Sequence, residues 1–208
     1  MSFRAIIAAS VVFLIVAIRA LAAPQLSQPI PFAIAPGKTT ELTLQGGQLL
    51  SPLRLWTTFA AKTEFVPPAD DAGKKGEKLI CRITVPRGEQ VGIGALRLLS
   101  TAGLSNPVFV VLDDLYTVAE VPDNHTVAQA QKLQPPIAVD GQCDAVQEDF
   151  YRFHANAGER LSFEVVSQRI GARLDPVVHL YKADGREIER FDDADCIGGD
   201  VRFAHTFE

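Results

Sequence analysis

The chain lacks a second long hydrophobic run. After residue 22 no apolar stretch approaches the about 20 residues that a membrane-spanning helix needs, so we expect the remainder to be soluble. The first stretch has Arg4, an apolar run over residues 5–18 and a small-residue exit at residues 20–22, the pattern of a secretory signal peptide. We therefore predict a signal peptide over residues 1–22 and a secreted, periplasmic or cell-surface location. Because Arg19 lies close to the predicted cleavage site, an uncleaved membrane anchor is the alternative.

Positive charge is also scarce. The chain has 20 basic and 25 acidic residues, and two of the basic ones, Arg4 and Arg19, belong to the predicted signal. The exported part would then carry a net charge of about −7. Nucleic-acid binding requires basic patches, which argues against a nucleic-acid partner. An acidic surface suits an exported module and is compatible with divalent cations.

Cysteine is rare, and the three present do not form a Cys-x-x-Cys pair, so a zinc site or thioredoxin-like chemistry is not expected. Cys81 lies within an alternating apolar segment and is predicted to be a buried thiol. Cys143 and Cys196 lie in turn-like acidic contexts, where an exported chain can keep a disulfide between them. The odd number leaves at least one thiol outside any such pair or shared between chains.

Catalytic motifs are absent as well. The four histidines are scattered singly, and none belongs to a His-Glu-x-x-His pattern. Residues 103–107 lack the last glycine of a nucleophile elbow, and residues 92–94 lack the third glycine of a dinucleotide-binding loop. We therefore predict that this chain is not an enzyme and that any catalytic domain would lie outside it.

What the chain does contain is a succession of short alternating segments separated by turn residues. In its first part these lie at residues 39–44, 53–59, 79–85, 94–99 and 108–112, a spacing typical of a β-sandwich. No amphipathic helix is evident there, and residues 67–78 read as a long polar loop. We predict an immunoglobulin-like sandwich over residues 25–115, with the single tryptophan, Trp56, in its core.

Further strand candidates follow at residues 150–153, 160–166 and 176–181, with turns at residues 157–159 and 183–185. The ordered succession of an Asp-x-x-x-Phe strand from Asp149, an Ala-x-x-Gly turn, Leu174-Asp175-Pro176 and Asp192-Asp193 resembles the bacterial pre-peptidase C-terminal domain. The arrangement as a whole resembles exported planctomycete-type multidomain proteins. The first resemblance implies a jelly-roll-like β-sandwich over residues 135–208 that serves as an accessory rather than a catalyst. The predicted fold class is thus all-β, with two tandem β-sandwich domains after a signal peptide.

Residues 116–134 are predicted to link the two domains. Their Glu, Pro, Asp and Asn cluster, from Glu120 to Asn124, resembles the lead-in of pre-peptidase and collagen-binding-like modules, although Asp123 and Asn124 stand in reverse order. Residues 127–133 are expected to form about two helical turns.

The acidic turn near the C-terminus is the clearest candidate site. Alternating acids and glycines over residues 192–200 let a loop surround a hard cation, which prefers six to eight oxygen ligands. A solvated turn without metal is the alternative. Related collagen-binding-like modules bind calcium through acidic loops, so the resemblance implies Ca²⁺ as the cofactor. The candidate calcium ligands are Asp192, Asp193, Asp195, Asp200, Glu120 and Asp123.

The family pattern continues with a turn and a final strand beyond the last residues here, so we expect a truncated module or a fragment. We predict an exported non-catalytic binding module that is calcium-stabilised and engages an extracellular or envelope protein or a polysaccharide. The alternative is the non-catalytic front of a secreted peptidase whose catalytic domain is absent from this chain. The genomic sequence downstream would distinguish the two.

Overall fold

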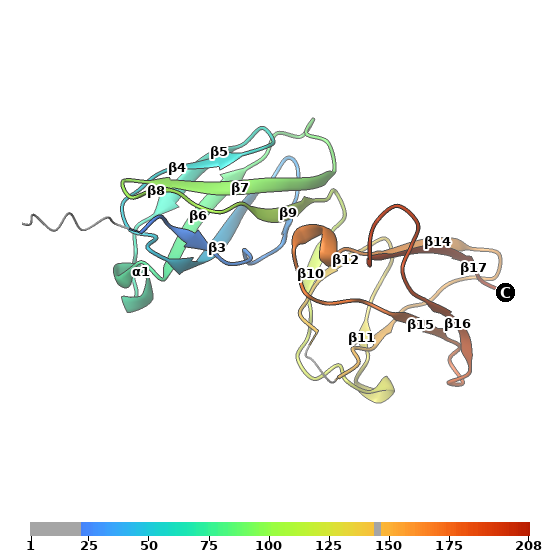
Figure 1. Ribbon diagram of the computed structural model, residues 1–208. Coiled ribbons are helices and arrows are strands. Elements are labelled where there is room, and N and C mark those ends of the chain that lie inside the picture. Colours follow the sequence, from blue (N-terminus) through green and yellow to red (C-terminus); the bar gives the residue numbers. More distant parts are fainter. Residues whose placement is uncertain (1–21, 144–146) are drawn as a thin grey trace, which may run out of the picture.

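The computed structural model describes residues 22–143 and 147–208, and it is built almost entirely of β-strands (Figure 1). The all-β prediction is therefore confirmed. The predicted signal lies almost wholly outside the described residues. Within the described ranges, no helix is long and apolar enough to cross a membrane.

The strands of the first group occupy residues 25–112. They are β1 (Gln25–Leu26), β2 (Ala33–Ile34), β3 (Thr39–Gly47), β4 (Pro52–Thr57), β5 (Lys62–Val66), β6 (Lys78–Thr84), β7 (Gly92–Ser100), β8 (Gly103–Leu104) and β9 (Val108–Leu112). Two sheets result, one in the order β1-β3-β6-β5 and the other in the order β2-β9-β7-β4, with β8 paired to β7. Within the described residues, the main hydrophobic core lies between these two sheets.

Alternation explains that core. In β3, Leu42 and Leu44 are buried while the residues between and before them are not, and Cys81 and Ile83 repeat this pattern in the neighbouring β6. Because successive side chains of a strand point to opposite faces, one face of each sheet is apolar and buries itself against the other sheet.

Trp56 does not belong to this core, so its predicted role is wrong. Leu55 is 2% exposed and faces the opposite sheet, whereas Trp56 is 46% exposed on the outer face. The alternation of side chains along β4 is compatible with burial of either face of the strand. The shorter Leu55 packs inside, and Trp56 shares the outer face with the charged Arg54.

The segment expected to be a long polar loop contains a short helix, α1 (Asp71–Lys75). The Asp70 carboxylate caps its first turn by accepting a hydrogen bond from the Gly73 N–H at 2.8 Å. Gly76 ends the helix in the left-handed conformation, with φ of 76°, which glycine adopts without steric cost. An N-cap aspartate and a C-terminal glycine explain a helix where the hydrophobic pattern gives no signal.

The second group consists of short strands paired two by two. They are β10 (Thr117–Ala119), β11 (Gln131–Lys132), β12 (Ala138–Asp140), β13 (Tyr151–Arg152), β14 (Arg160–Val165), β15 (Val178–Tyr181), β16 (Glu187–Phe191) and β17 (Val201–Thr206). The pairs β10–β12 and β11–β13 are parallel, while β14–β17 and β15–β16 are antiparallel. Two single-turn 3₁₀ helices, η1 (Val127–Gln129) and η2 (Gln168–Ile170), complete the group.

Residues 116–134, predicted as a linker, supply β10 and β11 to this pairing. The prediction of two helical turns over residues 127–133 is wrong. Only η1 forms, capped by the Thr126 hydroxyl, and the chain then extends into β11.

Aromatic rings fill much of the space between β14, β16 and β17. Phe203 stacks on Phe191 with a centroid distance of 3.5 Å and on Phe163 at 4.8 Å, and Phe153 contacts Phe163 and Phe207. All five rings remain half-buried. This apolar layer is thus more open to solvent than the core between the two large sheets.

The two groups are in contact with each other. The Asp140 carboxylate at the end of β12 accepts a hydrogen bond from the Phe32 N–H at 2.7 Å. The 3₁₀ helix η2, with its buried Ile170, lies against β9. Burial raises the pKa of Asp140, and the hydrogen bonds from the backbone near β2 oppose that rise.

Candidate functional site

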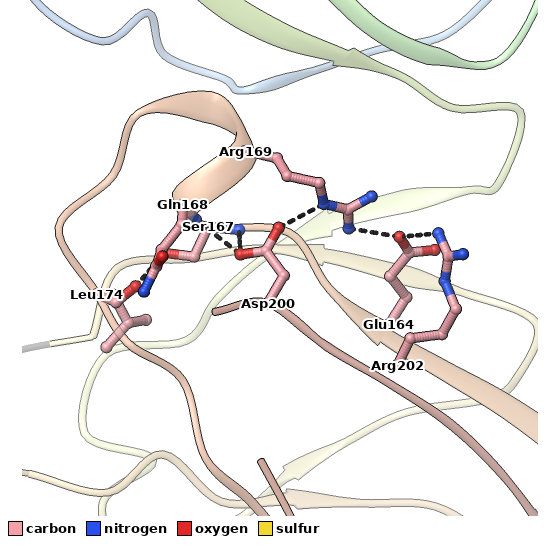
Figure 2. A network of polar contacts seen from close by, with 7 residues as sticks. All are labelled: Glu164, Ser167, Gln168, Arg169, Leu174, Asp200 and Arg202. Carbon is pink, nitrogen blue, oxygen red and sulfur yellow. Dashed lines mark hydrogen bonds and ion pairs between the residues drawn. The ribbon is translucent and has the colours of Figure 1, made fainter. Parts of the chain in front are cut away.

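The six predicted calcium ligands do not come together, and only two of them, Asp200 and Glu120, belong to networks of polar contacts. Asp200 belongs to what we call the Asp200 network, formed by Glu164, Ser167, Gln168, Arg169, Asp200 and Arg202 (Figure 2). Glu120 belongs to what we call the Glu120 cluster, formed by Glu120, Asn124, Gln142 and Tyr151.

Asp200 is fully buried, and its carboxylate is already satisfied. One oxygen accepts hydrogen bonds from the backbone N–H groups of Ser167 at 2.9 Å and Gln168 at 2.7 Å. The other accepts from the Arg169 Nε at 2.6 Å. Burial works against the charged form, yet Arg169 and the two backbone donors lower the pKa of Asp200 overall. The side chain thereby fixes the start of η2, which points to a structural role.

The network continues from Arg169 to the surface. A second guanidinium nitrogen of Arg169 lies 2.5 Å from Glu164, which also pairs with Arg202 at 2.6 Å (Figure 2). Glu164 and Arg202 face each other across β14 and β17. The chain of charges therefore ties η2 to this pair of strands.

The rest of the acidic turn is exposed. Asp192 pairs with Arg190 at 2.6 Å, while the side chains of Asp193 and Asp195 point into solvent. Across residues 22–143 and 147–208, no three His, Cys, Asp or Glu side chains are grouped closely enough to hold a metal ion. A calcium site in this part of the chain would need amide, backbone carbonyl or water oxygens as well as carboxylates.

The Glu120 cluster offers such a mixture. Glu120 directly follows β10, and Gly141 and Gln142 directly follow β12. The carboxyl ends of parallel strands meet at one edge, and there Glu120 Oε2 accepts a hydrogen bond from the Gln142 N–H at 2.9 Å. A Cβ on Gly141 would lie 2.6 Å from that same oxygen, so only glycine fits without displacing Glu120.

The other carboxylate oxygen, Glu120 Oε1, accepts hydrogen bonds from the Tyr151 hydroxyl and from Asn124 Nδ2, the latter at 3.2 Å. Burial, together with the neighbouring charge of Glu120, raises the pKa of Tyr151 well above its usual range. The phenol therefore stays protonated and donates to Glu120 throughout the physiological pH range.

Asn124 is the unusual member of the cluster. Its side chain is 1% exposed, and its Oδ1 atom has no hydrogen-bond partner among the described residues. A buried acceptor without a partner costs about 1–3 kcal/mol, and such atoms are few in folded proteins. This oxygen can accept a hydrogen bond from water or coordinate a cation.

The cluster borders a cleft of about 800 Å³ between the two strand groups. One wall is formed by residues 30–33, Ala35, Lys38 and Thr40, and the other by residues 115–125 together with 140–142. Asp123 lies on this cleft with an exposed side chain, and His125 beside it pairs with Asp149 at 3.0 Å. A small ligand has access to the cluster from this side.

Sequence reasoning named Glu120, Asp123 and Asn124 but missed Tyr151 and Gln142. In the sequence Tyr151 has only the pattern of a strand residue, and Gln142 belongs to no motif. Their approach depends on the parallel pairing of β10 with β12 and of β11 with β13, which the alternation of single strands does not reveal.

The cysteines follow the sequence analysis in one respect only. Cys81 is fully buried, and burial raises the pKa of its thiol to about 11. Cys196 is an exposed free thiol in the described part of the chain, so the disulfide considered between Cys143 and Cys196 is not formed.

Comparison with known proteins gives no family. No family model matches the chain, and no curated protein matches it. Among solved structures, the chain is similar to SGBP-B of the Bacteroides ovatus mixed-linkage glucan utilization locus, in complex with a mixed-linkage heptasaccharide, with 14% identity and a TM-score of 0.35. It is also similar to the gamma-CGTase of alkalophilic Bacillus clarkii, with 16% identity and a TM-score of 0.34.

These alignments cover 90% and 91% of this chain but only 37% and 22% of the respective structures. The chain therefore spans well under half the length of either. At these TM-scores we draw no functional argument from the two similarities.

Proposed function

We propose that this chain is an exported, non-catalytic β-sandwich binding module in which the Glu120 cluster holds a calcium ion. The observation that supports the proposal is the buried amide of Asn124, whose Nδ2 donates to the Glu120 carboxylate while its Oδ1 has no hydrogen-bond partner among the described residues. A hard cation is a partner that both oxygens can share, since Ca²⁺ prefers carboxylate and amide oxygens. The Asn124 amide would turn its oxygen toward Glu120 when the ion binds.

Charge and access support the same choice. The cleft next to the cluster also contains the carboxylates of Asp123 and Asp140 against a single lysine, Lys38, so negative charge dominates around a bound cation. Backbone carbonyls and water would complete the coordination, as in most calcium sites. The ion would hold together the ends of β10 and β12, where the second strand group meets the first. Such a module presents its surface to a polysaccharide or to an envelope protein.

Terbium luminescence tests the location of the ion. Tb³⁺ replaces Ca²⁺ in oxygen-rich sites and emits when a nearby tyrosine or tryptophan is excited. Tyr151 touches the Glu120 cluster, so Tyr151→Phe should remove most of the sensitised emission. Tyr181→Phe is the matched control, because Tyr181 is about as exposed but belongs to β15.

Calcium titration with thermal melting tests the stabilisation. Saturating Ca²⁺ should raise the melting temperature, because a ligand that binds only the folded state stabilises it. Glu120→Gln should abolish the shift, while Asp193→Asn and Asp195→Asn should leave it unchanged. If the two aspartate variants lose the shift and Glu120→Gln keeps it, the ion belongs to the acidic turn at residues 192–200. Absence of both emission and shift would reject calcium binding.

A further inference from the structure

Strand β4 forms an open edge of its sheet. It stands last in the order β2-β9-β7-β4, at the opposite side from β2 and β9, which contact the second strand group. Within the described residues it pairs only with β7. An unpaired edge strand offers a row of backbone donors and acceptors to another strand.

The hydrogen bonds of the neighbouring turn identify which groups are free. The Thr58 N–H donates to the Ala95 carbonyl on the β7 side, and inward and outward groups alternate along an antiparallel strand. Arg54 and Trp56 therefore direct their backbone groups toward β7. The N–H and C=O groups of Leu55 and Thr57 point away from the sheet, available to a partner.

The side chains on the outer face of this edge form an unusual pair. Arg54 and Trp56 stand two residues apart on the same face and are both exposed. Among the described residues, no carboxylate forms an ion pair with Arg54. The nearby edge strand β5 differs, because its exposed Lys62 and Glu64 pair with each other at 2.7 Å. Charged residues protect edges from association, and the single charge of β4 is Arg54, which has no carboxylate partner among the described residues.

We propose that β4 is a self-association edge that pairs antiparallel with β4 of a second copy of this chain, with Leu55 opposite Leu55 at the two-fold axis. In this register the outward N–H and C=O groups of the two Leu55 residues exchange hydrogen bonds. Arg54 of each copy then stands directly opposite Trp56 of the other, on the outer face. The guanidinium of one copy meets the indole of its partner in two symmetric cation–π contacts.

Electrostatics select this register over its neighbours. A shift one way would place Arg54 opposite Arg54, which brings two like charges together without a counter-ion. A shift the other way would place Trp56 opposite Trp56 and leave both arginines without an aromatic partner. The bulge between Pro52 and Arg54, and the missing N–H of Pro52, limit the pairing to the second half of the strand.

Sedimentation velocity over a wide concentration range tests the association. We expect a reversible dimer in the unmodified chain and a roughly tenfold weaker dimer in Arg54→Gln, since each cation–π contact contributes modestly. Arg160→Gln is the matched control. It makes the same change at an exposed strand residue, but Arg160 lies on β14 in the second strand group, far along the chain from this edge. A monomer at every concentration, or equal weakening by both variants, would overturn the proposal.

Disulfide trapping tests the register. Arg54→Cys and Trp56→Cys are prepared separately, each with Cys143→Ser and Cys196→Ser, and then mixed and oxidised. Facing residues of a non-hydrogen-bonded antiparallel pair have Cα atoms about 4.5 Å apart, within the range that a disulfide bridges. We expect the mixed dimer to form in clear excess over either homodimer. Predominance of an Arg54→Cys or Trp56→Cys homodimer would overturn the register.

Discussion

At the scale of single residues, the burial of Asp200 has a consequence for stability. Asp200→Asn would remove the charge that Arg169 and two backbone N–H groups share, so we expect a loss of about 2 kcal/mol in the free energy of unfolding at pH 7. That figure is below the range for fully buried pairs, because Arg169 is partly exposed. Urea denaturation measures it, with the exposed Asp193→Asn expected to change little.

The pH dependence of the same residue has a definite sign. The pKa of Asp200 is lower in the folded state than in the unfolded state, so its contribution is present above the unfolded-state pKa. Stability is lost as the pH falls through the folded-state pKa. The difference between the unmodified chain and Asp200→Asn should therefore shrink below about pH 4. A difference that stays constant down to pH 2 would show that the charge of Asp200 does not stabilise the fold.

Cys81 and Cys196 should differ sharply in reactivity. Burial raises the pKa of the Cys81 thiol to about 11, so almost none of it is thiolate at pH 8, and the surrounding core excludes reagents. Cys196 is exposed. With Cys143→Ser as background, a thiol-specific disulfide reagent should label one cysteine rapidly and the second only in denaturant. Two equally fast thiols in the folded chain would contradict the buried position of Cys81.

At the scale of elements, the junction after β10 and β12 depends on a glycine. Gly141→Ala would place a methyl group 2.6 Å from a Glu120 oxygen that Gln142 also holds, and we expect a loss of about 1–2 kcal/mol from this crowding. Gly88→Ala is the control, because a Cβ there meets nothing within 4 Å. Chemical denaturation of both variants compares the two losses. Equal changes in the two variants would show that crowding against Glu120 is not the cause of the loss.

The strands and the Glu120 cluster differ in how well the sequence predicts them. Alternation predicted the long strands β3, β6, β7 and β9, because a two-residue period and a buried face leave little freedom. The alternation failed for Trp56, because a two-residue period does not say which of the two faces is buried. The charged Arg54 on the same face as Trp56 was the signal that this face is exposed. Glu120 and Asp123 were named from a local acidic motif. Tyr151 joins Glu120 only through pairing between distant segments, and no local pattern encodes that pairing.

At the scale of the whole molecule, the two strand groups should differ in local stability. The first encloses a core of fully buried aliphatic side chains, whereas among the described residues of the second only Ile170, Leu180 and Val201 are buried hydrophobics. Local opening requires less free energy where fewer apolar contacts are lost. We therefore expect amide hydrogens of β3, β6 and β7 to exchange most slowly and those of β10–β13 to exchange faster.

Hydrogen exchange read by mass spectrometry, with and without Ca²⁺, connects this difference to the proposed site. If an ion binds the Glu120 cluster, protection should increase in β10 and β12, whose ends it would hold, and spread to residues 30–34 through the Asp140–Phe32 hydrogen bond. The core strand β6 should not change, because its backbone pairs with β3 and β5 and not with residues 30–34. Protection that rises instead around residues 192–200 would place the ion in the acidic turn. Uniform protection in all strands would mean that the two strand groups open together. In that case the contacts of Asp140 and η2 would hold the two groups together more strongly than the partly solvent-exposed aromatic layer suggests.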